Sequence, residues 1–311
     1  MRTVYELEEA RKKAYEKINM QTNGGAYRIT LGMATCGIAA GAKPVMDAFI
    51  EELKKRNIRN VSVVMTGCVG VCRLEPIVEV IDCRGAKTTY VRMNPEKAAR
   101  VVAEHIEKGR PCAGYVVGAE DGSSGGAWSL EETGFFKRQM RIALRNCGVI
   151  NPENIEEYIA FGGYGALGKV VSEMKPEEVI EKIKRSGIRG RGGGGFQTGL
   201  KWEFTARSKS DEKYVCCNAD EGDPGAFMDR SILEGDPHSI VEAMAIAAYA
   251  VGSSQGYIYV RAEYPVAVKR LNIAIRQARE NGLIGRGILG SDFCFDVELR
   301  LGAGAFVCGE E

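Results

Sequence analysis

Four successive glycines occupy positions 192–195, inside the segment GIRGRGGGGFQTGLKW. Glycine loses more backbone entropy on folding than any other residue, so such a run is costly unless the bare main chain is put to use. Flexible linkers are also rich in glycine, but large side chains such as Phe196, Lys201 and Phe204 would be wasted in a linker. The segment therefore predicts an ordered loop whose main chain lies against a ligand.

The composition limits the classes of protein to consider. The chain has 311 residues, enough for two domains, and its 42 basic and 41 acidic residues nearly cancel, so neither a nucleic acid nor an anionic membrane is indicated as a partner. The longest apolar stretch, SIVEAMAIAAYAVG, is too short to cross a bilayer, and the N-terminus lacks a signal-peptide core. We therefore expect a cytoplasmic protein without direct membrane insertion.

Hydrophobic periodicity divides the chain into two α/β domains. Residues 1–112 predict a compact domain in which a first helix is followed by a strand, a helix, three short strands and a last helix. Residues 113–133 have the composition of a linker. Residues 134–311 begin with helices, one of them over 135–148, and continue with strands alternating with helices, which predicts a layered, mostly parallel sheet whose first strand is buried.

Ten cysteines are more than packing requires in an intracellular chain and indicate metal or redox chemistry. Cys68 and Cys72 stand four apart in GCVGVC, after the second predicted strand, and Cys36 follows the first. Two thiolates so spaced can share one iron or zinc ion, although cysteine is also a common core residue. Zinc and a [2Fe-2S] cluster both need four ligands, and His105 is the one histidine nearby.

This cysteine pattern resembles that of the thioredoxin-like [2Fe-2S] ferredoxins, which have a pair of cysteines five apart after the first strand and a pair four apart after the next. Cys36, Cys68 and Cys72 match three of the four positions, and Leu31 stands at the remaining one. Three possibilities stay open: Cys83 as the fourth metal ligand, a ligand that is not cysteine, or a domain that has kept the fold without the cluster.

The glycine run differs from the dinucleotide-binding fingerprint, which follows a strand, because the preceding segment EEVIEKIKRSG has helical spacing. The physics of a glycine loop still holds: amide N–H groups can converge on a phosphate, and a flat ring can lie against bare backbone. Phe196 and Phe204 could stack on a second ring, and Lys201 could meet a phosphate.

Two further segments follow predicted strands: CNADEGDPGAFMDR at positions 217–230 and GAGAFVCGEE at the end of the chain. The acidic side chains of the first could simply cap the next helix. Strand ends are, however, where ligands bind in layered α/β folds, and acceptors placed there suit ribose hydroxyls or the amide edge of a flavin or nicotinamide.

Together, these three segments resemble the NADH-binding flavoprotein subunit of respiratory complex I and its relatives in soluble NAD-linked [FeFe]-hydrogenases and formate dehydrogenases. The resemblance covers residues 134–311, and the preceding thioredoxin-like domain makes the hydrogenase-type, electron-bifurcating subunits the nearer match. It implies hydride transfer between NAD(H) and FMN, followed by single-electron steps to iron–sulfur clusters. The residues that would face FMN are Gly192, Gly193, Gly194, Lys201, Asn218, Asp220, Glu221, Phe306, Gly309, Glu310 and Glu311. Those near NADH would be Phe196, Phe204, Asp223 and Glu311.

The resemblance also implies partners: a small ferredoxin-type [2Fe-2S] subunit and a catalytic subunit such as a hydrogenase or formate dehydrogenase. Members of the family continue into a further flavin-contacting segment and a cysteine motif for a [4Fe-4S] cluster, so we expect the FMN/NADH-binding domain to be incomplete at Glu311. Gln197 stands where the family has proline. Two other functions remain in view: an electron-carrier or scaffold subunit with an incomplete flavin site, and a zinc-stabilised binding protein.

Overall fold

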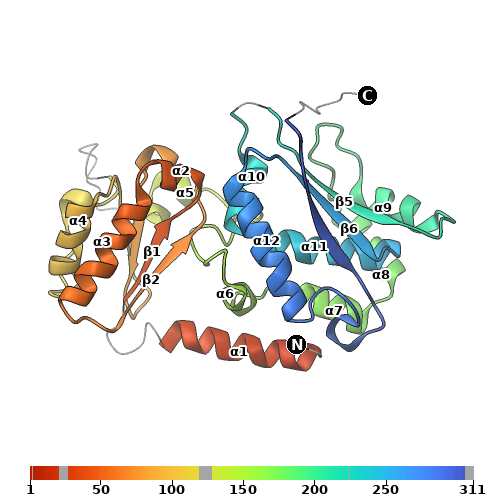
Figure 1. Ribbon diagram of the computed structural model, residues 1–311, viewed down its shortest axis with the longest axis horizontal. Coiled ribbons are helices and arrows are strands. Elements are labelled where there is room, and N and C mark those ends of the chain that lie inside the picture. Colours follow the sequence, from red (N-terminus) through yellow and green to blue (C-terminus); the bar gives the residue numbers. More distant parts are fainter. Residues whose placement is uncertain (2, 21–26, 119–127, 224, 305–311) are drawn as a thin grey trace. The chain divides into compact units, whose positions relative to one another are not determined.

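The computed structural model describes residues 1, 3–20, 27–118, 128–223 and 225–304 (Figure 1). It is an α/β protein whose described residues form two compact units. Unit 1 comprises Met1–Ala14, Glu153–Leu233 and the described part of Pro237–Glu311, and unit 2 comprises Tyr15–Pro152 and Glu234–Asp236. These bounds differ from those of the predicted domains, because residues 1–14 lie in unit 1 and residues 134–152 and 234–236 lie in unit 2.

Unit 2 contains a four-stranded sheet in the order β2-β1-β3-β4. Strand β1 pairs with β2 in parallel, while β3 is antiparallel to both β1 and β4. The parallel pair is joined by a helical crossover, and a helix follows β4, which is the predicted thioredoxin-like arrangement. The strands are β1 Tyr27–Gly32, β2 Val61–Thr66, β3 Val78–Ile81 and β4 Lys87–Tyr90, and the helices are α2 Thr35–Ala39, α3 Ala42–Lys55, η1 Cys72–Leu74, α4 Pro95–Val101 and its π-helical continuation η2 Val102–Ile106.

The core of unit 2 is formed where β1 meets α3 and α4. Ile29 and Leu31 point from β1 into this core, where they meet Val45 and Phe49 of α3, and all four side chains are at most 1% exposed. Alternation along β1 therefore places Thr30 and Gly32 on the opposite face of the sheet. The cysteine cluster described below lies at the carboxyl end of this strand.

The described ends of the predicted linker are part of unit 2. Thr89 of β4 donates its N–H to Trp128 O at 2.7 Å and accepts a hydrogen bond from Val117 N at 3.0 Å, and Val91 N donates to Tyr115 O. Linker composition did not reveal this pairing, because β4 supplies the hydrogen-bond partners. Three short helices belong to the same region: η3 Ala113–Tyr115, η4 Leu130–Glu132 and α5 Gly134–Lys137.

The helix predicted over residues 135–148 is mostly absent. Helix α5 ends at Lys137, and residues 141–150 form turns. The guanidinium of Arg141 donates to the carbonyl oxygens of Leu144 at 3.0 Å and Cys147 at 2.5 Å. Leu144 O also accepts the N–H of Cys147 at 3.1 Å, three residues on, so the chain turns here and does not continue as an α-helix.

Unit 1 contains a three-stranded parallel sheet in the order β5-β6-β7, as predicted. Strand β5 was expected to be buried, but its residues mostly alternate between exposed and half-buried because it is an edge strand that pairs with β6 alone. Helix α11 is the central helix and buries most of its residues. The strands are β5 Tyr214–Ala219, β6 Gln255–Val260 and β7 Asp296–Leu301, and the helices are α6 Ile155–Ala160, α7 Gly165–Glu173, α8 Pro176–Ser186, α9 Thr198–Arg207, α11 Pro237–Val251, α12 Pro265–Glu280 and η5 Ile288–Gly290. Two helices are divided between the units: α1 Val4–Met20, which belongs to unit 1 up to Ala14, and α10 Met228–Gly235, which belongs to unit 1 up to Leu233.

Among the residues that the structure describes, no helix has the length and apolar character needed to cross a membrane.

A buried histidine near the start of α11 makes the stability of unit 1 depend on pH. His238 is 1% exposed and its ring nitrogens face Tyr164 Oη at 2.9 Å and Gln277 Oε1 at 3.1 Å. Neutral imidazole satisfies both partners, since one nitrogen accepts from tyrosine and the other donates to glutamine. Loss of hydration in the interior lowers the pKa of His238 to about 4.

In the unfolded chain His238 binds this proton near its ordinary pKa of about 6.5. The contribution of neutral His238 to the free energy of unfolding is therefore fully present above that pH and is lost as the pH falls towards 4. We expect the free energy of unfolding of the wild type to fall by about 3 kcal/mol over this range from His238 alone. The contribution is measured by urea unfolding of wild type and His238→Gln at several pH values. If the difference between the two proteins does not change with pH, His238 is not the titrating group.

Candidate functional site

The predicted glycine loop is held by a short β-type ladder. Helix α8 ends in Gly187, which has the left-handed φ of 70°. Beyond it, Arg189 and Gln197 form an antiparallel bridge, and Gly190 N donates to Phe196 O at 2.8 Å. The glycines at 192–195 therefore lie at the tip of an ordered loop between α8 and α9. In Figure 1 this loop reaches the end of unit 1 at which the strands finish.

The fold of the chain does not explain all of these glycines. A Cβ atom added at any position from 192 to 195 would meet no heavy atom of residues 1, 3–20, 27–118, 128–223 and 225–304 within 4 Å. Gly193 and Gly195 have positive φ values of 97° and 60°, which favour glycine, whereas Gly192 and Gly194 have neither positive φ nor a crowding neighbour. Bare backbone at these two positions is therefore consistent with a ligand that approaches the main chain.

Two exposed aromatic rings follow the loop. Phe196 is 53% exposed and Phe204 is 58% exposed, with ring centroids 6.4 Å apart and planes tilted by 48°. Lys201, on the first turns of α9, is also exposed. Phe196 and Phe204, predicted to stack, and Lys201, predicted to meet a phosphate, are therefore all exposed to solvent.

At the carboxyl end of β5, one carboxylate oxygen is buried without a partner. Asn218 Oδ1 accepts the N–H of Asp220 at 3.0 Å, which holds the chain in a turn directly after the strand. Asp220 Oδ2 is buried, and among the described residues nothing hydrogen-bonds to it. Burying such an atom unpaired is unfavourable, so a hydroxyl or amide donor from a ligand would stabilise it.

Glu221 has a structural role besides the predicted contact with FMN. Its side chain is buried, and its two carboxylate oxygens accept backbone N–H groups of Met228 at 2.5 Å, Asp229 at 3.0 Å and Arg230 at 3.1 Å. These are the first N–H groups of α10, which have no partner within the helix. The carboxylate therefore caps α10, and the contact of Glu221 with FMN stays a prediction.

The remaining predicted ligands of unit 1 fall into two groups. Asp223 is exposed on the loop after β5. Phe306, Gly309, Glu310 and Glu311 lie outside the residues that the structure describes.

In unit 2 the three predicted cysteines come together. The sulfur atoms of Cys36, Cys68 and Cys72 all lie within 4.8 Å of one another, and the last two are 3.5 Å apart. Cys36 follows β1 and Cys68 follows β2, and parallel strands bring their carboxyl ends to the same edge. Gly70, with a φ of 97°, turns the chain between Cys68 and Cys72. The pKa of Cys36 is raised, first by its hydrogen bond with Cys68 and then by burial.

The other candidate ligands do not join this cluster. Cys83 lies just beyond β3, whose last residue Ile81 pairs with Arg28 at the far end of β1, so the suggestion that Cys83 completes the ligand set is corrected by the register. Leu31 is fully buried in the core. His105 is buried too and its Nδ1 lies 2.8 Å from Tyr90 Oη, which makes it a core residue.

Glu75 is a neighbour of the cluster that sequence reasoning missed. It is 7% exposed, its Oε2 accepts the N–H of Ile77 at 2.7 Å, and its Oε1 lies 3.9 Å from Cys36 Sγ. Burial raises the pKa of Glu75 to about 7. The available signal was a single glutamate three residues after Cys72, before an apolar strand.

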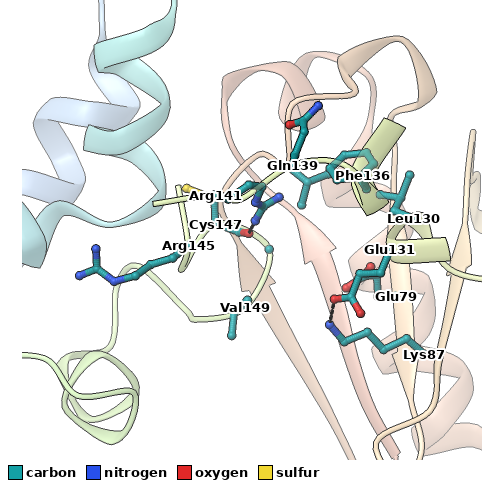
Figure 2. A pocket seen from close by; sticks show the side chains of 12 residues that line it. Glu79, Lys87, Leu130, Glu131, Phe136, Gln139, Arg141, Arg145, Cys147 and Val149 are labelled. Carbon is teal, nitrogen blue, oxygen red and sulfur yellow. Dashed lines mark hydrogen bonds and ion pairs between the residues drawn. The ribbon is translucent and has the colours of Figure 1, made fainter. Parts of the chain in front are cut away.

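Unit 2 also has a cavity of about 290 Å³ (Figure 2). It lies on the face of the sheet opposite the core, and Glu79 of β3 and Lys87 of β4 line it. Lys87 forms an ion pair with Glu131 at its rim, and Arg141 bonds to the carbonyl of Cys147, as the dashed lines show. Arg145 points away from the other lining side chains in this view. No sequence motif predicted this cavity.

The chain thus combines two features. One unit has a cysteine cluster on a thioredoxin-like sheet, and the other is an α/β unit with a bare glycine loop and, at its strand ends, an Asp220 Oδ2 without a partner among the described residues. The family described as the Nuo51 FMN-binding domain matches residues 183–311. Over these residues the chain is similar to the NADH-binding flavoprotein family.

Three curated proteins illustrate the similarity. The NADP-reducing hydrogenase subunit HndC of Solidesulfovibrio fructosivorans is 62% identical over 175 residues, which are 56% of this chain and 35% of that protein. An NADH-quinone oxidoreductase subunit of Rhizobium meliloti is 50% identical over 170 residues, 55% of this chain and 40% of its own length. The alpha subunit of the NAD-reducing hydrogenase HoxS of Cupriavidus necator is 36% identical over 250 residues, 79% of this chain and 38% of that subunit. The chain thus spans well under half the length of each of these relatives.

Proposed function

We propose that unit 1 binds FMN and NAD(H) and that the chain is the NADH-oxidising flavoprotein subunit of a larger oxidoreductase. The observation that carries this proposal is the bare backbone at Gly192 and Gly194, which nothing in the described part of the chain requires. The unpaired Asp220 Oδ2 at the strand ends supports it. The family match over residues 183–311 supports FMN as the type of ligand.

The residues of unit 1 act by binding and orienting. The loop at 192–195 lets a flat ring lie against the main chain, and Lys201 provides a cation for the FMN phosphate. Asn218 and Asp220 are suited to the hydroxyls or the amide edge of the cofactor. Phe196 and Phe204 are suited to stacking on NADH, with Asp223 close to its ribose.

When bound, FMN supplies the hydride acceptor, flavin N5, for the C4 hydrogen of the nicotinamide. No side chain of this unit needs to act as an acid or base for that transfer. The contribution of the protein is to hold the two rings at reacting distance and to keep them aligned. Gly192 and Gly194 serve this role by leaving the face of the loop open.

Unit 2 fits an iron–sulfur group because three thiolates converge at one edge of its sheet. We propose that Cys36, Cys68 and Cys72 hold a [2Fe-2S] cluster that exchanges single electrons within the complex. The partners would be a small ferredoxin-type [2Fe-2S] subunit and a hydrogenase, formate dehydrogenase or similar catalytic subunit, in the cytoplasm. We propose further that this complex bifurcates electrons.

The test is the flavin stoichiometry of the chain. The chain is titrated with FMN, and unbound FMN is removed by gel filtration. The chain should retain about one FMN per molecule, and the fluorescence of the bound FMN should be quenched. A chain that carries iron and sulfide but retains no flavin would instead support the alternative of an electron-carrier or scaffold subunit. Zinc without iron would indicate the zinc-stabilised binding protein.

A further inference from the structure

We propose that the carboxylate of Glu75 is the fourth ligand of the [2Fe-2S] cluster, completing a set with Cys36, Cys68 and Cys72. This inference rests on the iron–sulfur part of the proposed function and is independent of the flavin site. Four observations carry it: the path of the chain, the space around the carboxylate, the local charge, and the distances between donor atoms.

Glu75 lies in the segment between η1 and β3, and this segment brings its side chain to the cluster. Glu75 follows the short helix η1, which starts at Cys72. Gly32 N donates to Ile77 O at 3.2 Å, so the segment from 75 to 77 runs antiparallel past the carboxyl end of β1. Cys36 lies four residues beyond Gly32. Glu75 and Cys36 are therefore held together by the pairing of β1 with β3.

The space for this carboxylate is made by a glycine. A Cβ atom at Gly32 would lie 2.7 Å from Glu75 Oε1 and 3.0 Å from Oε2. Any larger residue would displace the carboxylate from its place beside Cys36. Leu31, the neighbouring residue on β1, points into the apolar core on the opposite face of the sheet and offers no ligand atom.

The charges at this site call for a cation. A buried carboxylate beside three thiols loses hydration, and all four groups bind metal as anions. Within the described part of the chain, no lysine or arginine forms an ion pair or hydrogen bond with Glu75, which contacts Ile77 N and Cys36 Sγ instead. Iron bound by the thiolates would supply the missing positive charge.

The donor atoms form two pairs. Cys68 Sγ and Cys72 Sγ are 3.5 Å apart, and Cys36 Sγ and Glu75 Oε1 are 3.9 Å apart. Two donors on one tetrahedral metal ion, at bond lengths of about 2.0–2.3 Å, lie roughly 3.5–3.8 Å from each other. A [2Fe-2S] cluster needs one such pair for each iron. Cys36 Sγ also lies within 4.8 Å of both other sulfurs, so it would have to move slightly away from them when the cluster binds. The proposal places Cys68 and Cys72 on one iron, and Cys36 and Glu75 on the other.

The test is anaerobic reconstitution with ferric iron and sulfide, followed by counts of iron and acid-labile sulfide and by visible absorption and circular dichroism. The proteins are wild type, Glu75→Gln, Glu75→Cys and, as a matched control, Cys83→Ser. Glu75→Gln keeps the shape of the side chain and removes its charge, and Glu75→Cys replaces oxygen by a thiolate. Far-ultraviolet circular dichroism before reconstitution shows whether each variant folds.

Wild type should take up about two irons and two sulfides per chain. Glu75→Gln should lose at least half of this iron. Glu75→Cys should retain the iron with visible bands moved to longer wavelength, because charge transfer to iron needs less energy from thiolate than from carboxylate. Cys83→Ser should match wild type.

Four results would overturn the inference. Equal iron and equal spectra for wild type, Glu75→Gln and Glu75→Cys would remove Glu75 from the ligand set, as would a loss of iron in Cys83→Ser alone. A single metal ion without sulfide would exclude the cluster. If folded wild type takes up no iron, the iron–sulfur part of the proposed function fails as well, whereas flavin binding is measured separately.

Discussion

Replacing Gly192 and Gly194 together by alanine is expected to weaken FMN binding about 100-fold, a loss of about 2.7 kcal/mol. Neither glycine has a positive φ, and an added Cβ at either would meet no atom of the described residues within 4 Å. The methyl groups would therefore not disturb the folded protein, but they would stand between the main chain and a ring lying on it. Affinity is measured by quenching of FMN fluorescence, and stability by thermal unfolding without FMN.

Gly114→Ala is the matched control. Gly114 is exposed in unit 2, has no positive φ and likewise has no atom within 4 Å of an added Cβ. It should leave both FMN affinity and the unfolding temperature unchanged. Wild-type affinity in the Gly192/Gly194 double variant would show that the flavin does not lie on this loop.

Replacing Glu242 by alanine is expected to lower the free energy of unfolding by about 4 kcal/mol. Glu242 is 6% exposed on α11, and its carboxylate accepts from Tyr158 Oη at 2.6 Å, Tyr164 N at 2.8 Å and Leu167 N at 3.1 Å. Tyr164 is the N-cap residue just before α7 and has a left-handed φ of 58°. The carboxylate of Glu242 holds the N–H of Tyr164 in this position. Without the carboxylate, the donors facing it lose their acceptor in a site closed to water.

Glu280→Ala provides the comparison. Glu280 is an exposed residue at the end of α12, and its ion pair with Arg276 is 3.9 Å long. Its removal should change the free energy of unfolding by less than about 0.5 kcal/mol. Urea unfolding of both variants measures the difference, and similar small effects for the two would show that the network around Glu242 contributes little to stability.

The sequence could predict the parts of the site that depend on local pattern. A run of four glycines is visible in any context, and the alternation of strands and helices implies a parallel sheet whose strands end at one edge. Cys36 and Cys68 each follow one of two such strands, so their approach to each other could be foreseen from topology.

The parts that depend on tertiary contacts could not be foreseen. Glu75 has no spacing relation to Cys36; the two meet because β1 and β3 pair antiparallel. The acidic composition after β5 does not tell a helix cap from a ligand contact, and the structure uses Glu221 for the first. Cys83 shares the chemistry of a ligand, but the register of β3 carries it to the other end of the sheet.

The measurement that tests the central claim most directly is an anaerobic titration of the FMN-loaded chain with NADH, followed through the visible flavin absorption. The account predicts that the flavin band is bleached by about one equivalent of NADH, because a hydride carries the two electrons that reduce one flavin. A chain whose bound FMN is bleached by dithionite but not by NADH would contradict it.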